Sequence, residues 1–465
     1  MEPIRIEPPR RRPRIIFCLI ALTLAVLLLA AGVLWHIRNR AWVDEVNLLR
    51  ESIFDTHLLF DDKMIYMWQL PEEIAASRDD VHQRVNAEAD ALIKRIPWMR
   101  ERDIILNLPR LVAALGDLHS NLDDAYWQYD VTPFFFAYMT DGYYFYAYHD
   151  GGFSAREQEV ALLGSKLVAV NGHDLAAVLE GAAQILASEN PYGTRAGLYN
   201  PLMNPAILYA IGLHSDPESA PEYTFEAPDG LVTLTPSGMI SLPDGVFFQD
   251  LTAMIYAKDD PTTRIDHPTD EYELFNLEKD TVLHIRCRAF SGPKIDKLAP
   301  DVEAALRINP QLETIIVDMR GNPGGYGRYS YGMLEAIRDG RPDLCQSGRI
   351  YVITDGGSLS AAVEMTFYLK TQCNATLVGE PTGQGVWFFA GASPLTLPKS
   401  GLAVYLSEYH SLFRVSGIAP IDPQRIYREA DAIYPDVLIE RTIEEYMADI
   451  DPVLEWILAQ PLKDE

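Results

Sequence analysis

Apolar residues follow different patterns in different parts of this 465-residue chain. The run from Ile15 to Trp35 contains no charged residue, and its 21 positions are enough for a helix to cross about 30 Å of hydrocarbon. From residue 41 to about 125, apolar and charged residues alternate at helical spacing, with turns near Pro71 and Pro109. That spacing predicts a small helical domain.

Residues 126–280 favour strands. Aromatic residues crowd between Phe134 and Tyr148, as in a sheet core, although a groove for an apolar ligand would show the same crowding. Lys166–Val170 runs into an Asn-Gly pair, which is typical of a strand that enters a tight turn. Thr- and Val-rich stretches with Pro-Asp-Gly and Pro-Ser-Gly turns follow between residues 230 and 270, and they predict further β structure.

From residue 281 onward, short β-branched runs alternate with helical patterns. The predicted strands lie at 282–288, 314–319, 350–354 and 376–379, and the predicted helices at 294–308, 331–338 and 360–370. This order predicts a βαβ core with mostly parallel strands. The stretch from Thr442 to Leu458 is amphipathic and predicts a last helix, which could pack on the core or on another copy of the chain.

Three segments carry the candidate chemistry. Ser360 lies between a buried strand and a helix, where backbone geometry can present a serine nucleophile, although serine is also an ordinary helix N-cap. The strand at 314–319 ends in a Gly/Pro-rich turn from Arg320 to Gly325, whose amides could converge on an oxyanion. His119 follows a helix and could serve as a base near neutral pH, although on its own it reads as a surface histidine.

Taken together and in this order, these segments resemble the tail-specific (C-terminal processing) serine peptidases, a family that includes the tricorn protease core. The resemblance rests on the Arg-Gly-Asn-Pro-Gly-Gly turn, the Ser360 junction, the turn around His119, the Gly-Glu-Pro-Thr-Gly segment from 379 and the Pro-Asp-Val segment from 435. It covers roughly residues 100 to 460. It implies a crotonase- or Clp-protease-like core and a PDZ-like element near residues 166–173.

The resemblance also implies a catalytic plan. The branch with a Ser–Lys dyad has a lysine just after the Gly-Glu-Pro-Thr segment, and residues 383–387 contain none. The tricorn-like branch implies Ser360 as nucleophile, His119 as base and Glu429 as the orienting acid, with Asp431 as the rival acid. Ser358 is the alternative nucleophile, because Glu364 falls one position later than usual relative to Ser360.

The oxyanion donors expected from this plan are the amide of Ala361 and that of Gly324 or Gly325. No cofactor and no metal are expected, since the plan needs none and no His/Cys cluster has zinc spacing. Cys345 and Cys373 flank the Ser360 segment, and the sequence leaves open whether they form a disulfide bond.

Charge and the apolar run predict the location. Lys and Arg number 39 against 66 Asp and Glu, a net charge of −27, which argues against nucleic acid as a partner. Arg10, Arg11, Arg12 and Arg14 precede the apolar run, which favours a cytoplasmic N-terminus and a retained signal anchor. The rest of the chain would then lie outside the cytoplasm, in the periplasm or at the cell exterior.

These inferences combine into one expected organisation. We predict a basic tail at 1–14, a transmembrane signal anchor at 15–35, a helical domain carrying His119 at 41–125, a β-rich segment at 126–280 and an α/β peptidase core at 281–465. The expected function is a membrane-anchored serine peptidase that cleaves peptide bonds through an acyl-enzyme at Ser360. Its expected partners are protein or peptide substrates and the membrane, and the sequence leaves open whether it forms homo-oligomers. The alternatives are a catalytically silent lipid- or peptide-binding protein and an esterase that uses the same serine.

Overall fold

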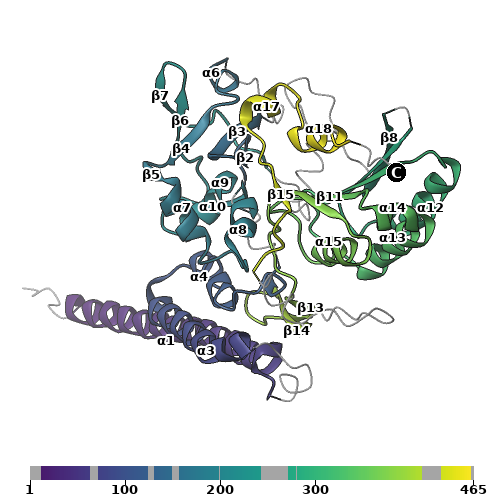
Figure 1. Ribbon diagram of the computed structural model, residues 1–465. Coiled ribbons are helices and arrows are strands. Elements are labelled where there is room, and N and C mark those ends of the chain that lie inside the picture. Colours follow the sequence, from purple (N-terminus) through teal and green to yellow (C-terminus); the bar gives the residue numbers. More distant parts are fainter. Residues whose placement is uncertain are drawn as a thin grey trace, which may run out of the picture.

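The chain is a mixed α/β protein, as the sequence predicts (Figure 1). The computed structural model describes residues 12–62, 72–123, 130–148, 157–197, 199–241, 271–278, 280–410 and 431–461. Within them, a helical group near the N-terminus, an antiparallel sheet and a mostly parallel sheet each enclose a buried apolar cluster.

The helix α1 (Arg12–Thr56) joins the predicted membrane anchor to the helical group without a break. Its N-terminal part projects away from the body of the molecule, and its C-terminal part lies against α3 (Glu72–Arg95) (Figure 1). Leu28 and Leu29 are accordingly 71% and 73% exposed, whereas Trp42 is 1% exposed. Between residues 35 and 41 the helix therefore continues, while its apolar side chains change from exposed to buried.

Among the described residues, one helix is long and apolar enough to span a membrane, over Leu22–Thr56. The helical group also contains α4 (Glu101–Ile105) and α5 (Pro109–Ala113). Its core includes side chains from a distant hairpin of β13 (Phe389–Thr396) and β14 (Ala403–His410). The strand β1 (Asn121–Leu122) pairs with β14, so this hairpin ties the segment after His119 to the C-terminal half of the chain.

The middle sheet is antiparallel, in the order β2-β3-β4-β6-β7, and β5 pairs with β4. Its strands are β2 (Phe134–Met139), β3 (Gly142–Tyr148), β4 (Lys166–Val170), β5 (His173–Asp174), β6 (Tyr223–Ala227) and β7 (Gly230–Leu234). The helices of this segment are α6 (Glu157–Val160), α7 (Leu175–Ala182), α8 (Pro191–Gly197), α9 (Tyr199–Met203) and α10 (Pro205–Ala210). Most of the crowded aromatic residues are the core of this sheet, as the strand reading predicts.

The C-terminal sheet has the order β15-β12-β11-β10-β9-β8. All neighbouring pairs from β9 to β15 are parallel, and β8 is antiparallel to β9. The strands are β8 (Tyr272–Leu277), β9 (Val282–Cys287), β10 (Thr314–Asp318), β11 (Ile350–Thr354), β12 (Thr376–Gly379) and β15 (Val437–Leu438). The strand β8 forms an edge of this sheet and lies before residue 281, where the sequence predicts that the α/β core begins.

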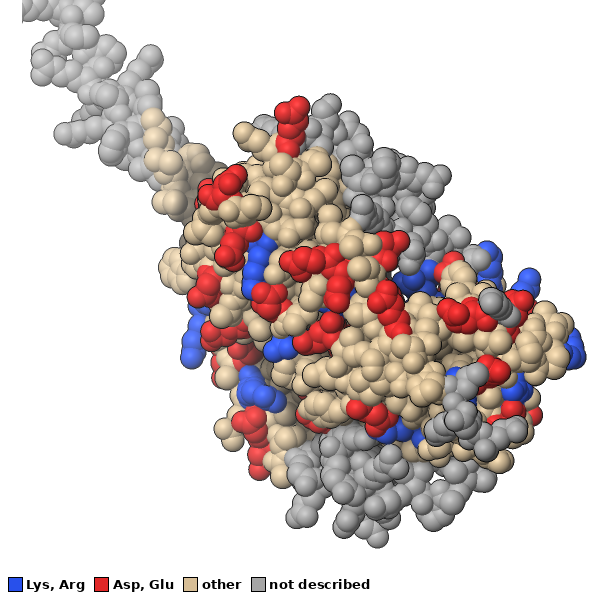
Figure 2. Space-filling view, turned by 45° about the horizontal axis from the view of Figure 1, so that its top comes forward, with Lys and Arg blue, Asp and Glu red and all other residues tan. Residues whose placement is uncertain are grey.

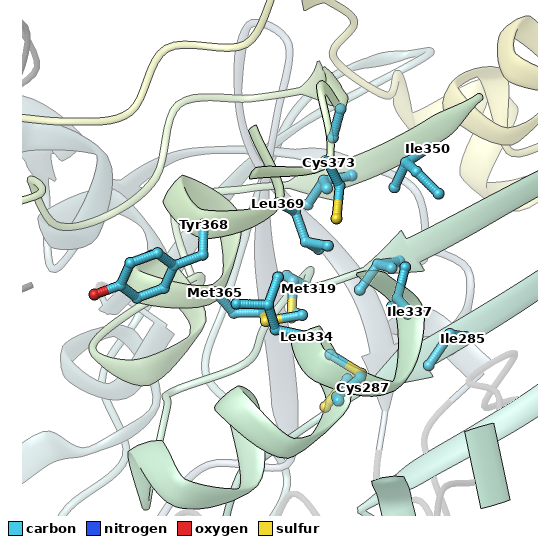
Figure 3. Packing of buried hydrophobic residues seen from close by; sticks show 14 of the residues in the cluster. Ile285, Cys287, Met319, Leu334, Ile337, Ile350, Met365, Tyr368, Leu369 and Cys373 are labelled. Atoms are coloured by element: carbon cyan, nitrogen blue, oxygen red, sulfur yellow. The ribbon is translucent and has the colours of Figure 1, made fainter. Parts of the chain in front are cut away.

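Helices cover both faces of this sheet, which explains why its strands read as continuous apolar runs. One face carries α12 (Leu298–Ile308), α13 (Gly327–Gly340), α14 (Pro342–Ser347) and α15 (Ala361–Gln372) over one large cluster, part of which Figure 3 shows. The other face packs against α18 (Pro452–Leu458). Cys287, Cys345 and Cys373 are buried free thiols.

The last helix differs from the prediction. The stretch from Thr442 to Leu458 forms two short helices, α17 (Ile443–Met447) and α18. Asp449 between them has a φ of 60°, and Pro452 lacks the amide hydrogen that a helix interior needs. These two features interrupt an apolar pattern that by itself would suit one continuous helix.

Candidate active site

Ser360 lies where the chain turns from β11 into α15. Its φ is 51° and its ψ is −121°, a strained conformation for a residue with a side chain. The hydroxyl makes no capping hydrogen bond to the helix, so Ser360 is not an ordinary N-cap. The strained turn leaves the hydroxyl available to a neighbour.

That neighbour is His119, which lies 241 positions earlier in the chain. The distance from its Nε2 to Ser360 Oγ is 3.0 Å. The imidazole ring stacks on Phe388, with ring centroids 5.3 Å apart and an angle of 10° between the planes. Burial lowers the pKa of His119, and the charge of Asp117 opposes this shift. The neutral form of the ring is therefore favoured and lies within hydrogen-bonding distance of a serine hydroxyl, which is the position that a base for this hydroxyl must occupy.

Asp117 holds the turn that carries His119, and sequence reasoning gave it no role. Its carboxylate accepts hydrogen bonds from the His119 amide at 2.9 Å and from Ser120 Oγ at 2.5 Å. The Leu59 amide donates to His57 Nδ1, so the proton of neutral His57 sits on Nε2 and is donated to Asp117 Oδ2 at 3.0 Å. Burial alone would raise the pKa of Asp117, but these partners outweigh it and hold the pKa at about 2.

Two further residues of the site were missed in the sequence. Gln384, in the loop after β12, accepts a hydrogen bond from the Ser360 amide at 2.7 Å and donates one to Glu189 Oε1 at 2.6 Å. The side-chain nitrogen Nε2 of Gln384 also lies 3.5 Å from His119 Nδ1. Glu189 precedes α8, and burial raises its pKa well above the usual range, with Asp117 adding to the shift. Glu189 belongs to no motif. Gln384 lies in the 383–387 segment, where sequence reasoning concerned the missing lysine and gave the glutamine no role.

Of the two predicted acids, Glu429 lies outside the described residues. Asp431 is exposed, and its carboxylate accepts a hydrogen bond from the Tyr434 hydroxyl at 2.8 Å. The Asp431 carbonyl also accepts a hydrogen bond from the Asn190 side chain at 2.5 Å. The Asp431 carboxylate is therefore committed to a surface contact. Among the described residues, the acids whose carboxylates lie near a His119 ring nitrogen are Asp117 and Glu189.

The predicted oxyanion residues differ in how they contact Ser360. A Cβ placed on Gly324 would come within 2.5 Å of Ser360 Cβ and 2.8 Å of the Ala361 nitrogen, whereas one on Gly325 would meet Phe290. Gly324 therefore lies directly against the serine. Its amide already donates to Asn322 Oδ1 at 2.8 Å, while the Ala361 amide opens α15 beside Ser360.

Ser358, the alternative nucleophile, is fully buried. Its hydroxyl donates to the Met319 carbonyl at 2.8 Å and accepts from the Asp355 amide at 3.1 Å. The bond to Met319 ties the loop before Ser360 to the end of β10, and the bond from Asp355 closes the turn after β11. Both are structural uses of the hydroxyl.

The same cluster offers the atoms that a metal ion would need. One potential ligand atom from each of Asp117, His119 and Glu189 lies within 4.8 Å of the others. Each residue also has the protein hydrogen-bond partners given above, so the present arrangement is a hydrogen-bonded network.

A pocket of about 650 Å³ adjoins the serine, since Leu359 and Pro323 line it. Its walls include aromatic side chains of β2 and β3 and the helix α8, whose Arg195 guanidinium lies 5.1 Å from the Tyr138 ring centroid. Acidic side chains line it as well, namely Asp355, Glu380 and Glu440. Burial and the charges of Asp355 and Glu440 raise the pKa of Glu380 to about 7.

The wider surface is also acidic. On the face in Figure 2, Asp and Glu side chains are spread over much of the described surface, with Lys and Arg between them.

Neither a protein-family model nor a curated protein matches the chain. Solved structures do match it. The crystal structure of mature CPAF matches with a TM-score of 0.55 at 13% identity, over 90% of this chain and 96% of that one. Mature CPAF complexed with lactacystin matches with a TM-score of 0.54 at 13% identity, over 90% and 97%. A photosystem II D1 C-terminal processing protease matches at a TM-score of 0.39 and 11% identity, over 86% and 93%. The chain therefore shares the fold of mature CPAF over most of the length of both chains.

Proposed function

We propose that the protein is a serine peptidase that cleaves peptide bonds through an acyl-enzyme at Ser360. The observation that carries the proposal is the 3.0 Å contact between Ser360 Oγ and His119 Nε2 at a strained turn. A hydroxyl paired with a buried neutral imidazole at the start of a helix is the arrangement of an activated serine nucleophile.

In the proposed reaction, His119 accepts the Ser360 proton while Oγ attacks the carbonyl carbon of the substrate. The oxyanion of the tetrahedral intermediate accepts a hydrogen bond from the Ala361 amide. The second donor is a glycine amide of the 324–325 turn, and Gly325 is favoured because the Gly324 amide is already bonded to Asn322. In enzymes with an oxyanion hole, each such donor lowers the activation barrier by about 3 kcal/mol. His119 then gives the proton to the leaving amine, and water hydrolyses the acyl-enzyme.

The pocket beside Ser360 supports a peptide substrate. Its volume suits one large side chain or a short peptide segment, and it combines aromatic walls with charged groups of both signs. We further propose that the antiparallel sheet of β2–β7 includes the PDZ-like element and adds a substrate strand at an edge, as such elements do. The core would then be the crotonase-like fold that the resemblance implies.

We also propose that the N-terminal helix anchors the protein in a membrane and that the domain after it lies outside the cytoplasm. The exposed apolar side chains of the first part of α1 support the anchor. The arginines at 10–14 support the orientation, because basic residues favour the cytoplasmic side.

The test is labelling of the detergent-solubilised full chain with a fluorophosphonate probe. We expect labelling of the wild type, loss in Ser360→Ala, a drop of about 100-fold or more in His119→Ala and retention in Ser358→Ala. Loss only in Ser358→Ala would show that the nucleophile is misassigned. An unlabelled but folded wild type would favour the silent binding protein. Comparison of peptide with acyl-ester substrates separates a peptidase from an esterase.

A further inference from the structure

We propose that Gln384 and Glu189 are positioning residues that decide which ring nitrogen of His119 carries the proton. In this proposal Gln384 holds the resting form, with the ring proton on Nε2. For His119 to act as the base, Nε2 releases its proton to solvent, Nδ1 gains a proton from solvent, and ionised Glu189 accepts the hydrogen bond from Nδ1–H. The inference rests on the proposed function, because it concerns the base of that reaction.

The orientation of the Gln384 amide follows from its neighbours. The Ser360 backbone N–H can only donate, so the atom that lies 2.7 Å from it must be the oxygen Oε1. The nitrogen Nε2 therefore faces the other way, toward Glu189 Oε1 at 2.6 Å and His119 Nδ1 at 3.5 Å. A flipped amide would lose both short hydrogen bonds.

This orientation constrains His119. Gln384 Nε2 can only donate, so the Nδ1 atom facing it is unprotonated in the neutral ring, and the single ring proton sits on Nε2. An Nε2–H group donates to Ser360 Oγ and cannot take its proton. A serine base needs the opposite tautomer, with Nδ1–H donating to an acceptor and Nε2 open toward the hydroxyl. The arrangement in the structure is thus a resting one.

Two described acids lie beside His119, and Asp117 already accepts hydrogen bonds from the His119 amide, Ser120 and His57. Glu189 is therefore the acceptor that we assign to Nδ1–H. One of its carboxylate oxygens lies within 4.8 Å of a ring nitrogen of His119, and a side-chain rotation of Gln384 away from Nδ1 would open that path. The Leu118 amide also donates to Glu189, which fixes the carboxylate next to the histidine turn. In the proposal, Glu189 replaces Gln384 as the partner of Nδ1 through side-chain rotations.

The charges around the ring make the exchange sensitive to pH. Glu189 faces Asp117 and His119, and Asp117 in turn contacts His57 and Ser120. Two ionised carboxylates beside a neutral ring repel each other, whereas an imidazolium between them offsets that repulsion. Ionisation of Glu189 and protonation of His119 therefore favour each other, as the transition state for proton abstraction requires.

The test compares three full-length variants by fluorophosphonate labelling between pH 5 and 9, with thermal unfolding as the check on folding. Glu189→Gln keeps shape and removes the carboxylate; we expect labelling to slow by at least about tenfold and its pH profile to shift. Glu189→Gln combined with Gln384→Glu exchanges the two groups, keeps their mutual hydrogen bond and places a carboxylate at Nδ1. We expect the exchange to restore labelling. The third variant, Glu429→Gln, tests the rival acid that the family resemblance implies.

A second readout does not depend on activity. The ¹⁵N shifts of His119 distinguish its tautomers, and we expect Nε2–H in the wild type and Nδ1–H in the exchanged variant. An unlabelled wild type would refute the proposed function, and these shifts would still decide the tautomer. A folded Glu189→Gln variant with an unchanged pH profile would overturn the inference, as would a profile that shifts only in Glu429→Gln. A wild type with Nδ1–H would overturn the resting form.

Discussion

Gly324→Ala tests whether the Gly-rich turn positions the candidate nucleophile. The φ of Gly324 is 96°, so any side chain there costs about 1–2 kcal/mol of backbone strain. The new Cβ would also lie 2.5 Å from Ser360 Cβ, whereas carbon atoms in contact prefer about 3.5–4.0 Å. One of the two groups must therefore move by about 1 Å.

Ser360 is the group expected to move. The Gly324 amide donates to Asn322, and its carbonyl accepts from the Phe290 amide at 2.7 Å, so both sides of the glycine are held. A shift of about 1 Å would lengthen the Ser360–His119 contact beyond hydrogen-bonding range, and a misplacement of that size costs about 100-fold in rate. We expect fluorophosphonate labelling to fall by that factor.

Gly321→Ala is the matched control. Gly321 has a φ of 67°, but a Cβ there would meet nothing within 4 Å, so this variant carries backbone strain of about 1 kcal/mol without the clash. We expect it to lose some thermal stability and to keep labelling within about twofold, because its Cβ makes no contact that would displace Ser360. If both folded variants are labelled at the same rate, the argument that Gly324 positions Ser360 is refuted.

Three further predictions address other parts of the molecule. Asp117 has a pKa of about 2 in the folded protein, against an ordinary value of 3.8. Its contribution to the free energy of unfolding, about 2 kcal/mol, is therefore present above pH 4 and lost as the pH falls through 2. Acid-unfolding measurements should show this pH dependence in the wild type and lack it in Asp117→Asn. Removal of residues 1–36 should release a folded protein from carbonate-washed membranes. Removal of residues 1–56 should unfold it, because Trp42 and its buried neighbours are lost. Peptides that place a lysine in the pocket should bind more tightly as the pH rises through 7, where Glu380 ionises, and Glu380→Gln should flatten that dependence in KM measurements.

Local pattern was sufficient for the elements of the core. Each predicted strand and helix between residues 282 and 379 has a counterpart in the structure, because strands covered on both faces by helices stay apolar throughout and contrast with amphipathic helices. The tight turn after β4 also matches, with Asn171 and Gly172 both at positive φ. The predicted single helix at the C-terminus was wrong, because apolar spacing does not register the break at Asp449–Pro452.

For the candidate site, too, local sequence indicated some residues, whereas their arrangement depends on contacts between distant parts of the chain. Ser360, His119 and the 324–325 glycines could be proposed from the sequence, because each sits at a junction of unusual local chemistry and because their order resembles that of a known family. Their approach to one another depends on β1 pairing with β14, which ties the histidine turn to the core.

What the sequence determined by itself were the elements, the apolar segment and the residues capable of the chemistry, since these depend on neighbours within a few positions. Only the tertiary structure placed Glu189 and Gln384 beside His119, 70 and 265 positions away along the chain. The reason is physical. A buried hydrogen-bond network is formed by whichever polar groups the packing brings together. The spacing of those groups in the sequence therefore does not indicate which of them will be hydrogen-bonded to one another.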